Sequence, residues 1–142
     1  MQNLLVIDDD PLFRSLITGA VERTYHVRTA SDGHEGYQTA VESRPDLVVL
    51  DLLMPTWGGV ETLRAFRTDA ELRTIPVLVM TGAEDEPEIA EARGMGISGL
   101  LLKSQFEKDL FLEMVEDAIA GGPVECPAGF DPVPVSSQHR DE

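Results

Sequence analysis

The sequence predicts an α/β fold in which helices cover both faces of a five-stranded parallel sheet. Short apolar runs alternate with amphipathic segments from residue 4 to residue 120. Most of these runs are apolar at successive positions, which is typical of strands that are buried on both faces. Strict alternation of strands and helices favours right-handed crossovers and parallel pairing. A chain of 142 residues, 42% hydrophobic and 26% charged, matches one globular domain.

Four of the expected strands are continuous apolar runs, at residues 4–7 (LLVI), 47–50 (LVVL), 77–80 (VLVM) and 100–102 (LLL). Residues 26–30 (HVRTA) alternate between polar and apolar instead. We place this second strand at an edge of the sheet, and we expect the continuous runs to be central. The resulting strand order is 2-1-3-4-5, the flavodoxin-like doubly wound arrangement, whose crevice lies at the carboxyl ends of strands one and three.

Five amphipathic segments separate or follow these strands. Pro11 opens the first, because proline is tolerated at the first position of a helix, and Asp10 before it can cap that helix. Apolar residues recur at helical spacing from there to Val21. The other helices are expected at Gly33–Glu42, Val60–Leu72, Pro87–Arg93 and Gln105–Ala120.

We expect one domain over residues 1–121, followed by a flexible Pro-rich acidic tail or linker over residues 122–142. The stretch from Pro123 to Glu142 holds four of the nine prolines and few large apolar residues. Nothing after Gly122 resembles a DNA-binding or catalytic domain. The chain is therefore expected to be either a stand-alone domain or part of a longer protein.

The charge of the chain excludes several classes of partner. A net charge of −15 and a pI near 4.4 argue against direct nucleic acid binding and against an anionic membrane surface. Cys126 is the only cysteine, so neither an intramolecular disulfide nor a thiolate metal site is supported. The start, MQNLLVIDDD, lacks a basic region, and its apolar run is too short for a signal peptide or a membrane span. We expect a cytoplasmic protein whose partner is basic or is a metal cation.

Acidic residues follow two strands that are neighbours in the predicted order. Asp8 and Asp9 come after the first strand, and Asp51 ends the third. Three carboxylates that share one crevice repel each other, which raises the pKa of at least one of them. Each pH unit by which a pKa rises corresponds to a free-energy cost of about 1.4 kcal/mol for the ionised form. A divalent cation removes this repulsion, and Mg²⁺ suits a few hard oxygen ligands on an open rim. The sequence therefore predicts a Mg²⁺ site at Asp8, Asp9 and Asp51.

A hydroxyl and an ammonium group follow the last two strands at the same edge. Thr81 ends the fourth strand and Lys103 follows the fifth. A threonine there is ordinarily a turn residue, but the chain has only two lysines against nine arginines, and Lys103 follows three leucines. A compact ammonium group suits contact with a carboxylate and a phosphate oxygen. Together the side chains at these four strand ends indicate one functional site.

These residues and their spacing closely resemble those of the receiver domain of two-component response regulators. The matching stretches are VIDDDP, VVLDLLMPTWGG, VLVMTG and GLLLKS, and the resemblance covers about residues 1–120. It implies that Asp51 accepts a phosphoryl group from a sensor histidine kinase or a phosphotransfer protein. It also implies that Asp8 and Asp9, with Asp51 and the backbone carbonyl of Leu53, bind Mg²⁺.

The resemblance implies a switch in a phosphorelay and not an enzyme that turns over an external substrate. Thr81 corresponds to the switch hydroxyl, and Lys103 to the lysine that contacts the phosphoryl group. Phosphorylation is expected to bias the face of the fourth helix, fifth strand and fifth helix, where a downstream protein or a second copy could bind. Slow autodephosphorylation would reset the state.

Four positions depart from the family pattern. Ser104 stands where a cis proline is usual, and since a non-proline cis bond costs about 2.5 to 4 kcal/mol, we expect a rearranged trans loop or a strained one. Leu100 replaces an aromatic residue that moves with the switch hydroxyl, so output through loop movement or dimer contacts is the alternative. Gly58 takes a place that is often polar. Trp57, expected to be exposed, either packs its loop or belongs to a partner surface.

Two residues should scaffold the loop after the third strand. Pro55 fixes its own φ angle and removes a backbone donor just after Leu53. Gly59 permits a tight return into the third helix. Proline and glycine are also common in ordinary loops, and this simpler interpretation of Pro55 and Gly59 is compatible with both roles.

Two other functions stay open. The string VIDDDPL also resembles the start of haloacid-dehalogenase-like phosphohydrolases, in which Asp8 would be the nucleophile. Leu12 replaces the Thr or Val of that pattern. The DLLMP segment after the third strand is not part of that family's pattern either. The second alternative is a pseudo-receiver, a phosphate-independent docking or dimerisation module, which Leu100 and Ser104 favour and the complete set of acids, threonine and lysine opposes.

Overall fold

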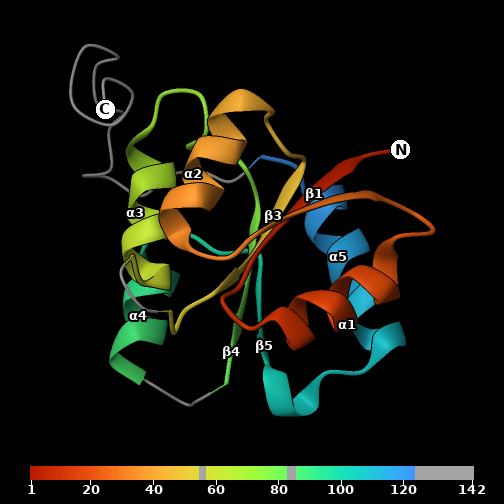
Figure 1. Cartoon of the computed structure of the whole chain (residues 1–142). Coiled ribbons are helices and arrows are strands. Elements are labelled where there is room, and N and C mark those ends of the chain that lie inside the picture. The colour runs from red at the N-terminus through yellow and green to blue at the C-terminus, as the bar shows by residue number, and fades with distance from the viewer. Residues whose placement is uncertain (55–56, 83–85, 124–142) are drawn as a thin grey trace.

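The computed structural model describes residues 1–54, 57–82 and 86–123 (Figure 1). Within these ranges strands and helices alternate along the chain as predicted. They are β1 (Asn3–Ile7), α1 (Pro11–Val21), β2 (His26–Ala30), α2 (Gly33–Glu42), β3 (Leu47–Asp51), α3 (Gly59–Thr68), β4 (Val77–Thr81), α4 (Glu86–Gly94), β5 (Gly99–Leu102), the 3₁₀ turn η1 (Lys103–Gln105) and α5 (Lys108–Ala120). All strand pairs are parallel, in the order β2-β1-β3-β4-β5. The flavodoxin-like α/β fold predicted from the sequence is confirmed.

Helices cover both faces of the sheet, with α1 and α5 on one face and α2, α3 and α4 on the other (Figure 1). Successive residues of the central strands point to opposite faces, so each face has its own hydrophobic cluster. Leu5 of β1 and Val48 of β3 belong to the first cluster, while Leu4 and Leu47 belong to the second. This two-sided burial explains why these strands are apolar at every position.

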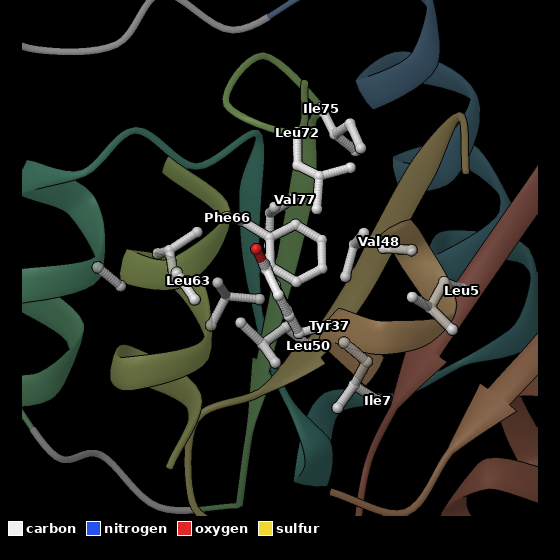
Figure 2. Packing of buried hydrophobic residues seen from close by; sticks show 14 of the residues in the cluster. Leu5, Ile7, Tyr37, Val48, Leu50, Leu63, Phe66, Leu72, Ile75 and Val77 are labelled. Carbon is white, nitrogen blue, oxygen red and sulfur yellow. The ribbon is translucent and has the colours of Figure 1, made fainter. Parts of the chain in front are cut away.

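The first cluster contains an aromatic pair that links α2 to α3 (Figure 2). The rings of Tyr37 and Phe66 pack edge to face, with 6.0 Å between centroids. The Tyr37 hydroxyl donates a 2.7 Å hydrogen bond to the buried carboxylate of Asp69. The polar end of a core tyrosine is thereby satisfied, as burial requires.

The two edges of the sheet differ in how well the sequence predicted them. β2 is an edge strand with mostly exposed side chains, as its alternating pattern indicated. β5 is the other edge, and three of its four residues are only half buried although the strand contains three consecutive leucines. The expectation that every continuous apolar run is central is therefore wrong for β5, which pairs with β4 alone.

Two predicted helix boundaries are also wrong. α3 ends at Thr68 and not at Leu72, because the Asp69 carboxylate accepts hydrogen bonds from the backbone N–H groups of Glu71 (2.8 Å) and Leu72 (3.2 Å). These bonds organise a separate turn that competes with the helix. α5 begins at Lys108 and not at Gln105, because the 3₁₀ turn η1 comes first.

A buried arginine, Arg67, ties three segments of the chain together. Its guanidinium donates to the carbonyl oxygens of Arg73 (3.1 Å) and Ile75 (2.9 Å), which precede β4. It also donates to those of Met95 (3.0 Å) and Gly96 (2.8 Å), just after α4. Arg67 is 0% exposed. The end of α3 thus holds the end of α4 in place.

The last helix ends at the residue that the sequence predicted. α5 ends at Ala120, and Gly122 follows in the left-handed region, with φ of 73°, which glycine adopts without steric cost. Residues 124–142, which make up most of the expected tail and include Cys126, lie outside the described residues. None of the helices described has the length and apolar character needed to cross a membrane.

Candidate functional site

The carboxyl ends of β1, β3, β4 and β5 meet at one edge of the sheet, the lower one in Figure 1. Asp8 follows β1, Asp51 is the last residue of β3, and Lys103 follows β5. The Nζ atom of Lys103 lies 2.8 Å from Asp8 Oδ2 and 3.1 Å from Asp51 Oδ2. The structure therefore brings these three predicted site residues together in one crevice.

Asp9 completes an acidic cluster at the crevice. One carboxylate oxygen from each of Asp8, Asp9 and Asp51 lies within 4.8 Å of the others. Asp8 and Asp51 are 1% and 3% exposed, while Asp9 is exposed. The cluster is thus buried on one side and open to solvent on the other.

Asp8 is held by hydrogen bonds from the loop that follows it and from α1. Its Oδ1 accepts a 2.9 Å hydrogen bond from the backbone N–H of Asp10, and its carbonyl oxygen accepts one of 2.7 Å from Arg14 Nη1. Asp10 in turn caps α1 by accepting from the N–H of Leu12, as predicted. Within the described residues, Asp8 Oδ2 is buried and accepts no well-aligned hydrogen bond. Its close contact is the ion pair with Lys103.

Asp51 is the most perturbed acid of the cluster. Its pKa is raised from 3.8 to about 6, chiefly by burial and in addition by the charge of Asp8. The backbone N–H of Leu53, which donates to Asp51 Oδ1 at 3.1 Å, and the ammonium of Lys103 both lower it. The carboxylate is therefore largely ionised at neutral pH and has hydrogen-bond donors on both oxygens.

Lys103 carries its charge inside the crevice. Burial lowers its pKa, but the hydrogen bonds and charges of Asp8 and Asp51 outweigh burial and raise the pKa above 10.5. The Nζ atom also lies 4.7 Å from the centroid of the Phe13 ring, and this ring packs edge-on against Phe106 at 5.3 Å. The hydrophobic pattern of the first helix includes Phe13 among its apolar residues and does not indicate its contact with Lys103. The available signal was an aromatic residue on each side of the crevice, five residues after Asp8 and three after Lys103.

Thr81 and Leu53 lie beside this group. Thr81 is fully buried at the end of β4 and pairs in register with Leu102, the residue before Lys103. Leu53 follows Asp51 by two residues and contacts its carboxylate through the backbone N–H. The residue is 37% exposed. Both predicted residues are thus at the crevice, with Leu53 reaching it through its backbone.

The loop between β3 and α3 returns tightly, as expected for Gly59. A side chain at this position would collide with the Cα atom of Leu52 and the carbonyl oxygen of Asp51. Gly58 is the N-cap of α3 and provides no side-chain hydrogen bond to the helix. The role predicted for Pro55 lies outside the described residues.

Trp57 packs its loop against α2. Its ring lies 5.4 Å from that of His34 and 6.2 Å from that of Tyr37, measured between centroids. The expectation that Trp57 is exposed is wrong, since the residue is half buried. Packing, one of its two predicted roles, is confirmed.

The loop after Lys103 has the trans form that was one of the two expectations for Ser104. No peptide bond in the described ranges is cis, and Ser104 lies inside the 3₁₀ turn η1. The turn closes with a 3.1 Å hydrogen bond from the N–H of Phe106 to the carbonyl oxygen of Lys103. Leu100, at the position usually aromatic, packs half buried against the first hydrophobic cluster.

The donor set of the crevice fits a hard divalent cation. Three carboxylates converge on an open rim, and the buried Asp8 Oδ2 lacks a well-aligned hydrogen-bond donor among the described residues. Magnesium prefers a few carboxylate oxygens together with water or phosphate oxygens. The same crevice holds an ammonium group beside the carboxylates, which suits a bound phosphoryl group.

Comparison with known proteins agrees with this geometry. The family model of the response regulator receiver domain matches residues 4–116. Protein PilH from Pseudomonas aeruginosa is 30% identical over 122 residues, which cover 85% of this chain and 100% of PilH. Transcriptional regulatory protein KdpE from Mycobacterium tuberculosis is 34% identical over 120 residues, which cover 84% of this chain and 51% of KdpE.

Solved structures show the same fold. The chemotaxis protein CheY4 of Vibrio cholerae superposes with a TM-score of 0.77 at 27% identity, covering 83% of this chain and 98% of CheY4. The share of each relative that the chain spans varies, down to 7% of hybrid signal transduction histidine kinase D from Dictyostelium discoideum. With the strand order and the acidic crevice already described, these matches establish that the chain belongs to the response regulator receiver domain family of two-component systems.

Proposed function

We propose that the chain is a phosphorylation-dependent switch in a two-component phosphorelay. Asp51 accepts the phosphoryl group from a sensor histidine kinase or a phosphotransfer protein. One observation carries the proposal: Lys103 Nζ bridges Asp8 Oδ2 at 2.8 Å and Asp51 Oδ2 at 3.1 Å inside a cluster of three carboxylates. The Lys103 ammonium, together with a divalent cation held by the carboxylates, would neutralise charge on a transferring phosphoryl group.

The residues that would hold Mg²⁺ are Asp8, Asp9 and Asp51, with the backbone carbonyl of Leu53. The convergence of the carboxylates and the buried, poorly bonded Asp8 Oδ2 support this assignment. When bound, the cation offsets the repulsion between the acids and stabilises negative charge on the phosphoryl oxygens.

The chain's own residues perform the transfer by position and charge. An ionised Asp51 oxygen attacks phosphorus in line, and the bond from phosphorus to the donor breaks as the bond to Asp51 forms. The Lys103 ammonium stays charged at neutral pH, because its pKa is raised, and stabilises the transferring oxygens. Thr81 then donates its hydroxyl hydrogen bond to a phosphoryl oxygen of the product.

The aspartyl phosphate adds about −2 charge to the crevice and changes the balance between two conformations. The face formed by α4, β5 and α5 is the proposed output surface, for a downstream protein or a second copy. Water later hydrolyses the aspartyl phosphate, so the chain resets and turns over no external substrate. We place the protein in the cytoplasm, with residues 122–142 as a tail or linker after the domain.

Incubation with acetyl phosphate and Mg²⁺, followed by intact mass measurement, tests the proposal. We expect a gain of one phosphoryl group that is absent in Asp51→Asn. Asp10→Asn is the matched control and should still be phosphorylated, because Asp10 caps α1 and asparagine caps equally well. No gain in the wild type would favour a phosphate-independent module. Release of phosphate that depends on Asp8 and not on Asp51 would favour a phosphohydrolase.

A further inference from the structure

A groove lies between α3 and α4, next to the crevice but outside the acidic cluster. Its volume is about 620 Å³, within the range of typical ligand sites. The two helices are neighbours on the left of Figure 1, where α4 lies below α3. The lining residues of the groove are Leu52, Leu53, Met54, Gly58, Val60, Glu61, Arg64, Glu88 and Glu91.

The floor of the groove is apolar and reachable from solvent. Leu52 is buried, while Met54 and Val60 are half buried and pack against the first hydrophobic cluster. Leu53 is 37% exposed, which makes it one of the exposed large hydrophobic residues. An apolar side chain from another molecule would cover this floor and be removed from water.

The rim of the groove is acidic. Glu61, Glu88 and Glu91 oppose a single lining cation, Arg64. Arg64 Nη2 lies 3.4 Å from Glu91 Oε2, and both side chains are about half exposed, at 51% and 55%. A surface ion pair of this kind contributes little and opens easily. The rim therefore favours a cationic ligand and opposes a phosphate or a nucleic acid.

The two helices that form the walls of the groove, α3 and α4, are tied together at their C-terminal ends. Arg67, one turn after Arg64 in α3, binds the carbonyl oxygens of Met95 and Gly96 at the end of α4. The two helices thus keep a fixed spacing at this end. A preformed groove costs a ligand less ordering free energy than one that must open.

We propose that this groove is a docking site for a basic amphipathic helix of a partner protein. Apolar side chains of the helix would cover Leu53, Met54 and Val60, and flanking Lys or Arg side chains would meet the three glutamates. A second copy is a poor occupant, because each chain carries a net charge of −15. The segment 124–142 is also a poor one, since it holds four acidic residues against one arginine.

Docking in the groove is linked to the crevice through Leu53. The backbone N–H of Leu53 contacts Asp51 Oδ1 at 3.1 Å, while its side chain lines the groove. A helix that fixes this side chain also fixes the backbone next to Asp51. By reciprocity, phosphorylation changes the affinity of the helix; this linkage, unlike the docking itself, rests on the proposed function.

A synthetic helical peptide of leucine and lysine, with leucines at helical spacing, tests the docking site. Its binding is followed by the fluorescence of Trp57, the only tryptophan, which directly precedes the lining residue Gly58. Binding is expected for this peptide and not for versions with glutamate in place of lysine or serine in place of leucine. Binding of the glutamate version with equal affinity would overturn the proposal.

Matched variants locate the binding. The double variant Glu88→Lys with Glu91→Lys should weaken binding about tenfold or more. Glu113→Lys with Glu116→Lys makes the same charge change at the same spacing on α5 and should leave the affinity close to wild type. Met54→Gln should also weaken binding, whereas Leu12→Gln, at an exposed leucine of α1, should not. Equal loss in site and control variants would show that the peptide binds the acidic surface without a site.

The linkage has its own readout. The peptide affinity is measured before and after treatment with acetyl phosphate and Mg²⁺, with intact mass confirming the modification. A changed affinity supports the linkage, and an unchanged affinity at full modification overturns it. Absence of modification would overturn the proposed function and the linkage together. The binding results from the untreated protein would still show whether the groove is a docking site.

Discussion

The ammonium of Lys103 lies 4.7 Å from the centroid of the Phe13 ring while it bridges two buried carboxylates. Phe13 comes from α1 and Lys103 from the turn after β5, so this contact orients the ammonium from a helix on one face of the sheet. The ring itself is braced by Phe106, three residues after Lys103.

Phe13→Leu should therefore slow phosphorylation of the chain. A cation–π contact contributes about 0.5 to 2 kcal/mol, which corresponds to a rate about two- to thirtyfold lower if the contact holds Lys103 in position. The measurement is the rate of mass gain with acetyl phosphate and Mg²⁺. Phe13→Tyr keeps the ring and should keep the rate. A Leu variant as fast as the wild type would show that the ring does not position Lys103.

Asp51→Asn should stabilise the metal-free protein at neutral pH. The pKa of Asp51 is raised to about 6 in the folded state from 3.8, so its stabilising contribution is full below pH 3.8 and is lost as pH rises through about 6. The ionised carboxylate then costs up to about 3 kcal/mol, at about 1.4 kcal/mol for each pH unit. Urea unfolding with a chelator should show the variant more stable at pH 7.5, with the difference vanishing near pH 4. A constant difference across this range would contradict the raised pKa.

Added Mg²⁺ should raise the unfolding temperature of the wild type. A cation that binds only the folded state stabilises it by about 2.7 kcal/mol at a hundredfold excess over its Kd. Asp9→Asn should reduce this shift, because Asp9 supplies one of the converging oxygens. The neighbouring Asp10→Asn should not, since Asp10 caps α1. Thermal unfolding with and without Mg²⁺ measures both, and equal shifts in the two variants would place the cation elsewhere.

Arg67→Lys should destabilise the fold although it preserves charge. The guanidinium makes four hydrogen bonds to backbone carbonyls, and a lysine cannot reach all of them. Carbonyl oxygens left without donors in the interior cost about 1 to 3 kcal/mol each, so we expect a loss of at least about 2 kcal/mol in urea unfolding. Arg64→Lys, at a half-exposed side chain of the same helix, is the control and should change stability by less than about 1 kcal/mol.

The sequence sufficed for the features that depend on local pattern. Continuous apolar runs predict the buried strands, and the strand order that follows from them places Asp8, Asp51 and Lys103 at one edge of the sheet. Features that depend on contacts between distant segments were missed. The Phe13 ring meets Lys103 only after the chain has crossed the sheet, so this contact is not visible in the spacing of neighbouring residues. The early end of α3 is a local effect, but hydrophobic spacing does not show that the Asp69 carboxylate accepts hydrogen bonds from the backbone two and three residues later.

Arg67 also determines how α4 is able to move. The helix is fastened at its C-terminal end by a single guanidinium that binds Met95 and Gly96. A helix held at one end can pivot only about that end, so its other end has the larger freedom to move. For α4 the free end is the one that follows β4 and Thr81. The fold therefore gives α4 a pivot at Arg67, at the end of the helix that is remote from the crevice.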